Sequence, residues 1–198
     1  MGRRARAVGA VVIAATLCSG VSAAAQNLAE VRLADSKYRY VDWNYTWGSG
    51  VVVDLFYVGV PGSNEFNLGG GYNVKRGPLV VTPLIYFVLG REDSQRGVKV
   101  ALLVAFEKDG WKLLSFVGSY FPVSGAVTRY EVLDTLDLTR KIGSRWEAGL
   151  QSGFFHSGDA WNPQVGPVLK LNDHLGAWAV SYRFGPQNEL RVGRVLTF

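Results

Sequence analysis

The last ten residues of the chain, Glu189–Phe198, read ELRVGRVLTF, and they decide the fold. Apolar side chains alternate here with polar or small ones, so that one face carries Leu190, Val192, Leu196 and Phe198. A period of two residues is typical of a β-strand with one apolar and one polar face. Because chain ends usually fray and are polar, a strand that stops on an aromatic residue is expected to pair with another strand.

The first 25 residues have the layout of a secretory signal. Arg3, Arg4 and Arg6 give a positive start, an apolar segment covers 7–21, and Ala-Ala-Ala at 23–25 provides an A-x-A exit. A membrane anchor is the alternative, but the segment is rich in Ala and Gly rather than Leu and Ile. We therefore expect cleavage after Ala25, export of the chain, and one mature domain over 26–198.

The only cysteine, Cys18, lies inside this signal. The mature chain then forms no disulfide and must draw its stability from another source, such as a long β-ladder. Loss of the three signal arginines lowers the formal charge from +5 to about +2. The high pI thus reflects targeting, and it does not predict a nucleic-acid partner.

Turn residues recur at short, even intervals along the rest of the chain. Eleven clusters, from ADSK at 34–37 to FGPQNE at 184–189, separate twelve candidate strands rich in Val, Tyr, Phe, Trp and Leu. This pattern is typical of antiparallel hairpins. No segment after the signal reaches about 18 uninterrupted apolar residues, so we expect no transmembrane helix there.

The candidate strands divide their faces consistently, and two folds fit that division. In 98–106, Val98, Val100 and Leu102 oppose Lys99 and Ala101. A soluble sandwich or lipocalin-like barrel would turn the apolar face inward. A membrane barrel would turn it toward lipid and would line its interior with the polar face.

Three features favour the membrane barrel. Aromatic residues gather near strand ends, as in interfacial girdles; they include Tyr38, Tyr40, Trp43, Trp47, Trp111, Trp146 and Tyr182. The opposite face mixes Gly, Ala and Ser with charges of both signs, which suits a crowded lumen. The chain also finishes on an amphipathic strand with a terminal Phe198.

Together, the signal, the even antiparallel strands and the final aromatic strand resemble the Gram-negative outer-membrane β-barrel proteins. The resemblance covers the whole mature chain as a pattern. It implies an all-β, antiparallel up-and-down transmembrane barrel, most simply of twelve strands, with ten or eight as alternatives. It also implies an outer-membrane location, contact with lipid and lipopolysaccharide, and Phe198 as a signal that the barrel-assembly machinery reads.

With Phe198 in the periplasm, the longest connections, REDSQRG at 91–97 and HSGDAWNP at 156–163, become outer loops. Four residues conflict with this register. Two are prolines inside strands, Pro83 and Pro167, which lack a ladder donor. The other two are Asp134 and Arg194, charges on the lipid face that would cost about 2–4 kcal/mol at the bilayer midplane. A bulge near Leu133 would turn Asp134 inward, and Arg194 would reach the interface by snorkelling.

Charged residues on the polar face are the candidate site. We predict that the lumen is lined by Asp54, Lys75, Lys99, Arg129, Glu131, Arg145, Glu147, Lys170, Arg183 and Arg191. In one interpretation these groups pair with one another to satisfy a polar interior. In the other, an excess of cations selects small anionic or polar solutes. The two interpretations are compatible.

The predicted function is a narrow, passive channel for small polar or anionic solutes, since about eight strands fill their own lumen and about sixteen leave it open. The alternatives are a structural or surface-binding barrel with a filled lumen, and an outer-membrane lipid hydrolase that uses His156. The motif FFHSGD at 154–159 gives the second alternative. His156 and Ser157 are consecutive, however, and on a strand consecutive side chains point to opposite faces.

The remaining motifs predict no further chemistry. Two isolated histidines, His156 and His174, provide no transition-metal site, and we expect no cofactor. The glycines of NLGGGYN at 67–73 lack the Lys-Ser/Thr and the helix of a phosphate loop. We interpret them as small lumen-facing or kink positions.

Overall fold

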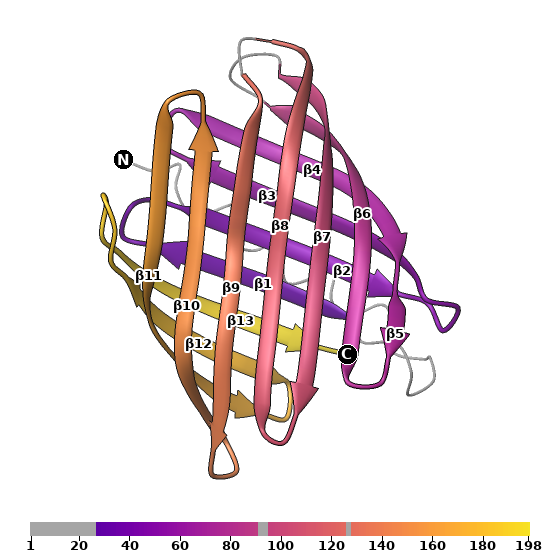
Figure 1. Cartoon of the computed structure of the whole chain (residues 1–198), viewed down its shortest axis with the longest axis vertical. Helices are drawn as coiled ribbons and strands as arrows, with labels where there is room; N and C mark the ends of the chain where they lie inside the picture. Colours follow the sequence, from indigo (N-terminus) through magenta and orange to yellow (C-terminus); the bar gives the residue numbers. More distant parts are fainter. Residues whose placement is uncertain (1–26, 91–94, 126–127) are drawn as a thin grey trace, which may run out of the picture.

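The computed structural model of the chain describes residues 27–90, 95–125 and 128–198. The predicted signal at 1–25 lies outside the described residues. Thirteen strands make one antiparallel sheet (Figure 1). They are β1 (Leu28–Ala34), β2 (Arg39–Thr46), β3 (Val51–Val60), β4 (Ser63–Tyr72), β5 (Val74–Arg76), β6 (Leu79–Gly90), β7 (Arg96–Lys108), β8 (Trp111–Ser124), β9 (Tyr130–Ile142), β10 (Trp146–Ser157), β11 (Ala160–Asp173), β12 (Gly176–Arg183) and β13 (Glu189–Thr197).

The sheet closes on itself, because its first and last strands pair. Leu28 lies opposite Thr197 and Ala34 opposite Arg191 in the β1–β13 ladder, and the backbone N–H of Phe198 donates to the Asn27 carbonyl at 3.1 Å. β4 and β5 pair with successive parts of β6, and together they occupy a single strand position in the barrel wall. The barrel therefore has twelve strands and one extra segment, and the predicted fold class and strand number are confirmed.

Pro83 explains where the β4–β5 position is interrupted. The β4–β6 ladder ends at the pair Gly71–Leu84, and the β5–β6 ladder begins at Val74–Val81. Pro83 falls in this gap, where its missing N–H leaves no ladder bond to make. Pro167 likewise precedes the start of the β11–β12 ladder at Val168. Each proline therefore lies in a gap of pairing on one side of its strand and is paired on the other side, Pro83 with Leu102 and Pro167 with Leu150.

Tight turns join strands at 47–50, 109–110 and 158–159, and a predicted turn cluster contains each of them. Asp109 and Gly110 both have positive φ, at 52° and 79°, which matches the type I′ geometry that favours Asp-Gly between strands. One predicted long loop is wrong. Instead of a loop over 156–163, β10 and β11 pair as far as Ser157–Ala160, and a turn at Gly158–Asp159 joins them.

The barrel has two rims, at opposite ends of its strands. The terminal rim holds Asn27, Phe198 and the turns at 47–50, 109–110 and 143–145. The loop rim, at the opposite ends of the strands, holds the connections at 35–38, 61–62 and 184–188.

The barrel wall is apolar outside and polar inside. Trp146 and Trp178 are 45% and 50% exposed on the outer wall. The interior buries a polar set that includes Asp54, Glu65, Asn67, Thr82, Lys99, Thr135, Asp137, Glu147, Gln151, Arg183 and Arg191. This inversion is the arrangement of a membrane barrel. In the part of the chain that the structure describes, no helix has the length and hydrophobicity needed to cross a bilayer.

Two exceptional positions on the wall have local explanations. Arg194 lies on the outer wall near the terminal rim, where its guanidinium covers the Trp178 ring at 5.1 Å and donates to Asp173 Oδ1 at 2.9 Å. It therefore reaches the rim as the snorkelling prediction expects.

Inside the barrel, a Cβ at Gly69 would overlap the Tyr86 ring. Glycine at 69 lets Tyr86 lie against the wall and donate to Asp54 Oδ2 at 2.7 Å.

Candidate functional site in the barrel lumen

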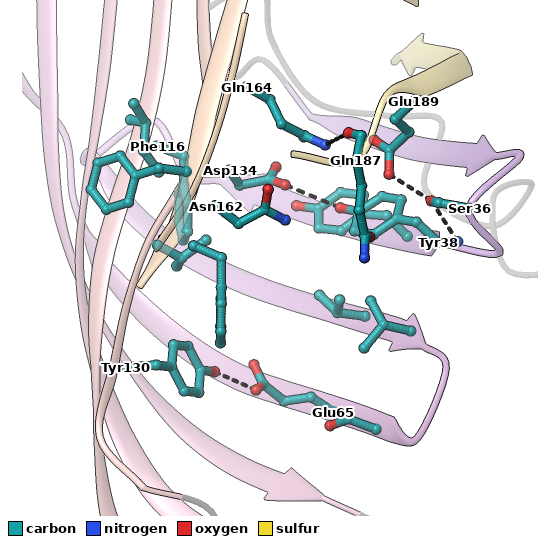
Figure 2. A pocket seen from close by; sticks show the side chains of 18 of the residues that line it. Ser36, Tyr38, Glu65, Phe116, Tyr130, Asp134, Asn162, Gln164, Gln187 and Glu189 are labelled. Carbon is teal, nitrogen blue, oxygen red and sulfur yellow. Dashed lines mark hydrogen bonds between the residues drawn. The ribbon is translucent and has the colours of Figure 1, made fainter. Parts of the chain in front are cut away.

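A cavity of about 380 Å³ occupies the half of the lumen nearer the loop rim. Its mouth includes the rim residues Ser36, Pro61 and Gln187, and its wall extends inward to Asp134 and Arg191. Figure 2 shows side chains from several strands converging on this space, with Tyr130 and Glu65 on one side and Asp134 and Tyr38 on another. The size falls in the range of about 300–1,000 Å³ typical of small-molecule sites.

Asp134 on β9 is the centre of a charged cluster at the inner end of the cavity. Its carboxylate accepts hydrogen bonds from the guanidinium of Arg32 on β1 and from the Tyr38 hydroxyl, the latter at 3.1 Å. Arg191 on β13 approaches it to 3.8 Å. Arg183 on β12 donates to the backbone carbonyl of Asp134 at 3.1 Å. These contacts cross the lumen and narrow it.

A β-bulge places Asp134 inside. The β8–β9 ladder passes from Leu133 to Thr135 and the β9–β10 ladder from Leu133 to Leu136, so Asp134 has no paired residue in either. An extra residue in one strand reverses which face the following side chains occupy. The simple alternation puts Asp134 on the lipid face, so this assignment is wrong, and the bulge expected near Leu133 is the physical reason.

Glu65 on β4 is the second crossing point. It accepts hydrogen bonds from Lys99 Nζ on β7, from the Tyr130 hydroxyl on β9, and from Asn67 Nδ2 at 2.8 Å. Its contact with Tyr130 is drawn in Figure 2. The side chains of Glu65 and Lys99 are 11% and 3% exposed. Such a buried pair is held by its geometry and by its additional hydrogen bonds.

Pairing continues along the wall toward the terminal rim. Asp137 accepts from Lys170 Nζ at 2.8 Å and from Gln151 Nε2 at 2.7 Å. Glu147 accepts from Lys112 Nζ at 2.6 Å and from Asn172 Nδ2 at 2.9 Å. Hydrogen bonds to these two carboxylates thus connect lumen-facing side chains of the four strands β8 to β11. These contacts line the wall without crossing the lumen.

Acids outnumber bases in the described lumen between the rims. The acids are Glu30, Asp42, Asp54, Glu65, Asp134, Asp137, Glu147 and Glu189, and the bases are Arg32, Lys99, Lys112, Lys170, Arg183 and Arg191. The predicted excess of cations is therefore wrong for this part of the chain. Glu65 on β4 pairs with Lys99 on β7, and Glu30 on β1 pairs with Arg32 of the same strand, whereas Asp42 and Asp54 accept from tyrosine hydroxyls.

The ten residues predicted to line the pore fall into three groups. Asp54, Lys99, Glu147, Lys170, Arg183 and Arg191 lie in the lumen. Lys75 is exposed on the short β5, and Arg145 is exposed in the turn before β10, where its carbonyl accepts from Asn172. The structure places Arg129 and Glu131 on the outer wall instead, because the bulge at Asp134 reverses the facing of the residues before it.

The outer-wall position of Glu131 gives it a different partner. His156 Nδ1 lies 2.9 Å from Glu131 Oε2, and Arg129 also bonds this carboxylate at 2.9 Å. Ser157, on the opposite face, lies 3.1 Å from the Thr128 hydroxyl and donates to the Arg129 carbonyl at 3.3 Å. His156 and Ser157 therefore engage different partners, as their adjacent positions predict. This is not the arrangement of a serine nucleophile and its base.

Sequence reasoning missed the aromatic lining of the cavity. Tyr38 and Tyr40, predicted for an interfacial girdle, are each only 8% exposed inside the barrel, where their rings stack. Tyr130 on β9 is also buried there. The sequence does indicate this inward position, because Tyr38 and Tyr40 share their strand face with the charged Asp42. Among the described residues, no group of three His, Cys, Asp or Glu side chains is placed to hold a metal ion.

Comparison with solved structures identifies the architecture. A KdgM porin matches with a TM-score of 0.64 and 15% identity, over 87% of this chain and 99% of that chain. The chain has the fold of the outer-membrane porins. A KdgM porin in complex with disordered oligogalacturonate matches at a TM-score of 0.65 and 13% identity, over the same shares of the two chains.

A NanC porin gives a further match, with a TM-score of 0.57 and 13% identity over 87% of this chain and 99% of that chain. No protein-family model matches the sequence, and no curated protein matches it either. The likeness to the porins is thus one of architecture.

Proposed function

We propose that this protein is an outer-membrane channel for small polar solutes. The observation that carries the proposal is a cavity of about 380 Å³, lined by both charged and aromatic side chains, inside a closed barrel whose outer wall is apolar. A wall of this kind is stable in lipid because every strand is paired. Its interior can replace part of the hydration of a solute that enters.

The porin comparison supports this cargo. One of the similar structures is a KdgM porin, a barrel of the same fold, in complex with disordered oligogalacturonate. Twelve strands lie between the roughly eight that fill their own lumen and the roughly sixteen that leave it open. A narrow path for small solutes fits this strand number. The anionic version of the prediction needs unpaired cations, and most lumen bases here contact carboxylates.

In the proposed mechanism, the Asp134 cluster is the constriction. Arg32 on β1, Arg191 on β13 and Tyr38, just before β2, approach Asp134 from the far side of the lumen, so their side chains lie in the path of any solute. Transport is passive, since it needs only that the solute exchange hydrogen bonds with these polar groups as it passes. Catalysis has no part in the proposal.

The same proposal covers the surroundings of the barrel. The signal at 1–25 would direct export, and the terminal rim would face the periplasm. The outer wall would contact outer-membrane lipid and lipopolysaccharide, and Phe198 would be read by the assembly machinery. Phe198 is 41% exposed at the end of β13, where a receptor can reach it.

Conductance across a planar lipid bilayer tests the channel. The mature chain should insert in discrete steps, each adding the same small ohmic current in KCl. The cross-lumen ion pairs favour a second candidate, a structural barrel with a filled lumen. A protein that folds and inserts cleanly but carries no current supports that candidate and overturns the channel.

A further inference from the structure

The cavity charges are balanced. Six charged side chains line the cavity among the described residues, three acids and three bases: Glu65, Asp134, Glu189, Lys99, Arg183 and Arg191. A site that selects polyanions presents a net positive field from cations without built-in partners. The lining of this cavity has no such excess.

Each of the three bases is already engaged. Lys99 donates to Glu65, and Arg191 donates to Glu189. Arg183 donates to Gln151 Oε1 at 2.7 Å and to the Asp134 carbonyl at 3.1 Å. At Lys99 Nζ and Arg191 Nε, an incoming carboxylate would therefore compete with a carboxylate that the protein itself supplies. Displacing a buried partner leaves an unpaired charge, which is strongly unfavourable.

The cavity also contains hydrogen-bonding atoms without a partner among the described residues, and they are of both kinds. Gln95 Nε2 and Arg191 Nη1 are buried donors, the latter 3.8 Å from Asp134 Oδ1, and Asn162 Oδ1 is a buried acceptor. Asn162 points into the cavity beside Asp134 in Figure 2. An anion satisfies only donors and a cation only acceptors, whereas a hydroxyl group both donates and accepts.

Aromatic rings provide the apolar part of the cavity. Tyr38, Tyr40 and Phe56 form a row of ring contacts on one wall, with centroids 6.4 and 5.8 Å apart. Tyr130 and Phe155 form a second pair, 5.3 Å apart, and Phe155 is 42% exposed. Flat apolar surfaces beside a few placed polar groups are typical of small-molecule sites. They fit a solute that has both a C–H face and hydroxyl groups.

We infer that the cavity binds an uncharged, hydroxyl-rich solute with an apolar face, such as a short neutral saccharide, in preference to a polyanion. This inference rests on the proposed channel and specifies its solute. The saccharide ring would lie against Phe155 and Tyr130, and its hydroxyls would bond to Asn162 and Gln95.

Two readouts test the inference on the detergent-purified mature protein, namely equilibrium binding by calorimetry and block of the single-channel current. The probes are maltotriose, which is neutral, and trigalacturonate, which carries three carboxylates. Maltotriose should bind and lower the current, with at least tenfold tighter affinity than trigalacturonate. Phe155→Ala should weaken maltotriose binding at least tenfold. Phe87→Ala, an exposed ring on the outer wall, should leave binding unchanged.

The outcomes separate this inference from the proposed function. Tighter binding of trigalacturonate, or no binding of either probe, overturns the inference even if the protein conducts ions. Equal loss in both variants also overturns it, because the loss would then not come from the cavity. Binding of maltotriose by a protein that carries no current supports the inference and overturns the channel.

Discussion

The Tyr38 hydroxyl donates to Asp134 Oδ1 at 3.1 Å, and this bond joins residues 96 positions apart across the barrel lumen. Tyr38 precedes β2, whereas Asp134 is the bulged residue of β9. The contact belongs to the cluster that also holds Arg32, Arg183 and Arg191. The narrowest part of the proposed path therefore depends on the carboxylate of Asp134.

Asp134→Asn should shift the channel toward anion selectivity. The substitution keeps the side-chain volume but removes the negative charge that Arg32 and Arg191 face. The reversal potential in a KCl gradient measures the shift. Glu131→Gln is the matched control, because Glu131 lies on the same strand but on the outer wall. Equal shifts in the two variants would contradict the assignment of their faces.

Arg32 and Asp134 should be energetically coupled. Removing one partner of a buried ion pair costs about 3–5 kcal/mol, because the other charge is left unpaired. We expect Arg32→Ala and Asp134→Ala each to be destabilising and the double variant to cost less than the two together. A double-mutant cycle on the free energy of unfolding in urea should give a coupling of about 0.5–3 kcal/mol. Strictly additive effects would mean that the pair does not form.

Gly69→Ala should destabilise the barrel. The added Cβ would overlap the Tyr86 ring and the Ile85 carbonyl, which a closed wall cannot move apart easily. Overpacking of this kind costs about 1–3 kcal/mol. Gly48→Ala serves as the control, since nothing lies within 4 Å of its added Cβ. If the two variants unfold at the same urea concentration, Tyr86 does not lie on Gly69.

Phe198→Ala should lower the amount of folded barrel in the outer membrane of cells without changing refolding in detergent. The proposed reason is loss of a signal for assembly, since the backbone of Phe198 still donates to the Asn27 carbonyl. The fraction that migrates as a folded species in unboiled gels measures the effect. Phe184→Ala removes another exposed ring and should have no effect. A matching loss in both variants argues against a specific terminal signal.

The fold was accessible from sequence because its signals are local. Turn clusters such as EKDG at 107–110 fix the hairpins, and alternation fixes which face meets lipid. Even the positions of Pro83 and Arg194, which conflict with the pattern, have local explanations in a gap of the ladder and a nearby rim.

The candidate site was less accessible because its contacts are long-range. The conflicting charge at Asp134 pointed to a bulge near Leu133, but alternation along the strand did not show that the bulge would also reverse the facing of Arg129 and Glu131. The partners of Glu65 lie on β7 and β9, so its pairing depends on the diameter and stagger of the closed barrel. The residue types predict that charged side chains in the lumen pair with one another, whereas the identity of each partner depends on the three-dimensional structure.

Cysteine accessibility under current recording tests most directly whether the cavity is part of a conducting path. The only cysteine lies at position 18, in the predicted signal, so single cysteines can be introduced into the mature chain. Gln164 lines the cavity, and its neighbour Val165 is 50% exposed on the outer wall. A sulfonated thiol reagent should reduce the current of Gln164→Cys and leave Val165→Cys unaffected. The absence of any current, or a block of Val165→Cys alone, would contradict the account.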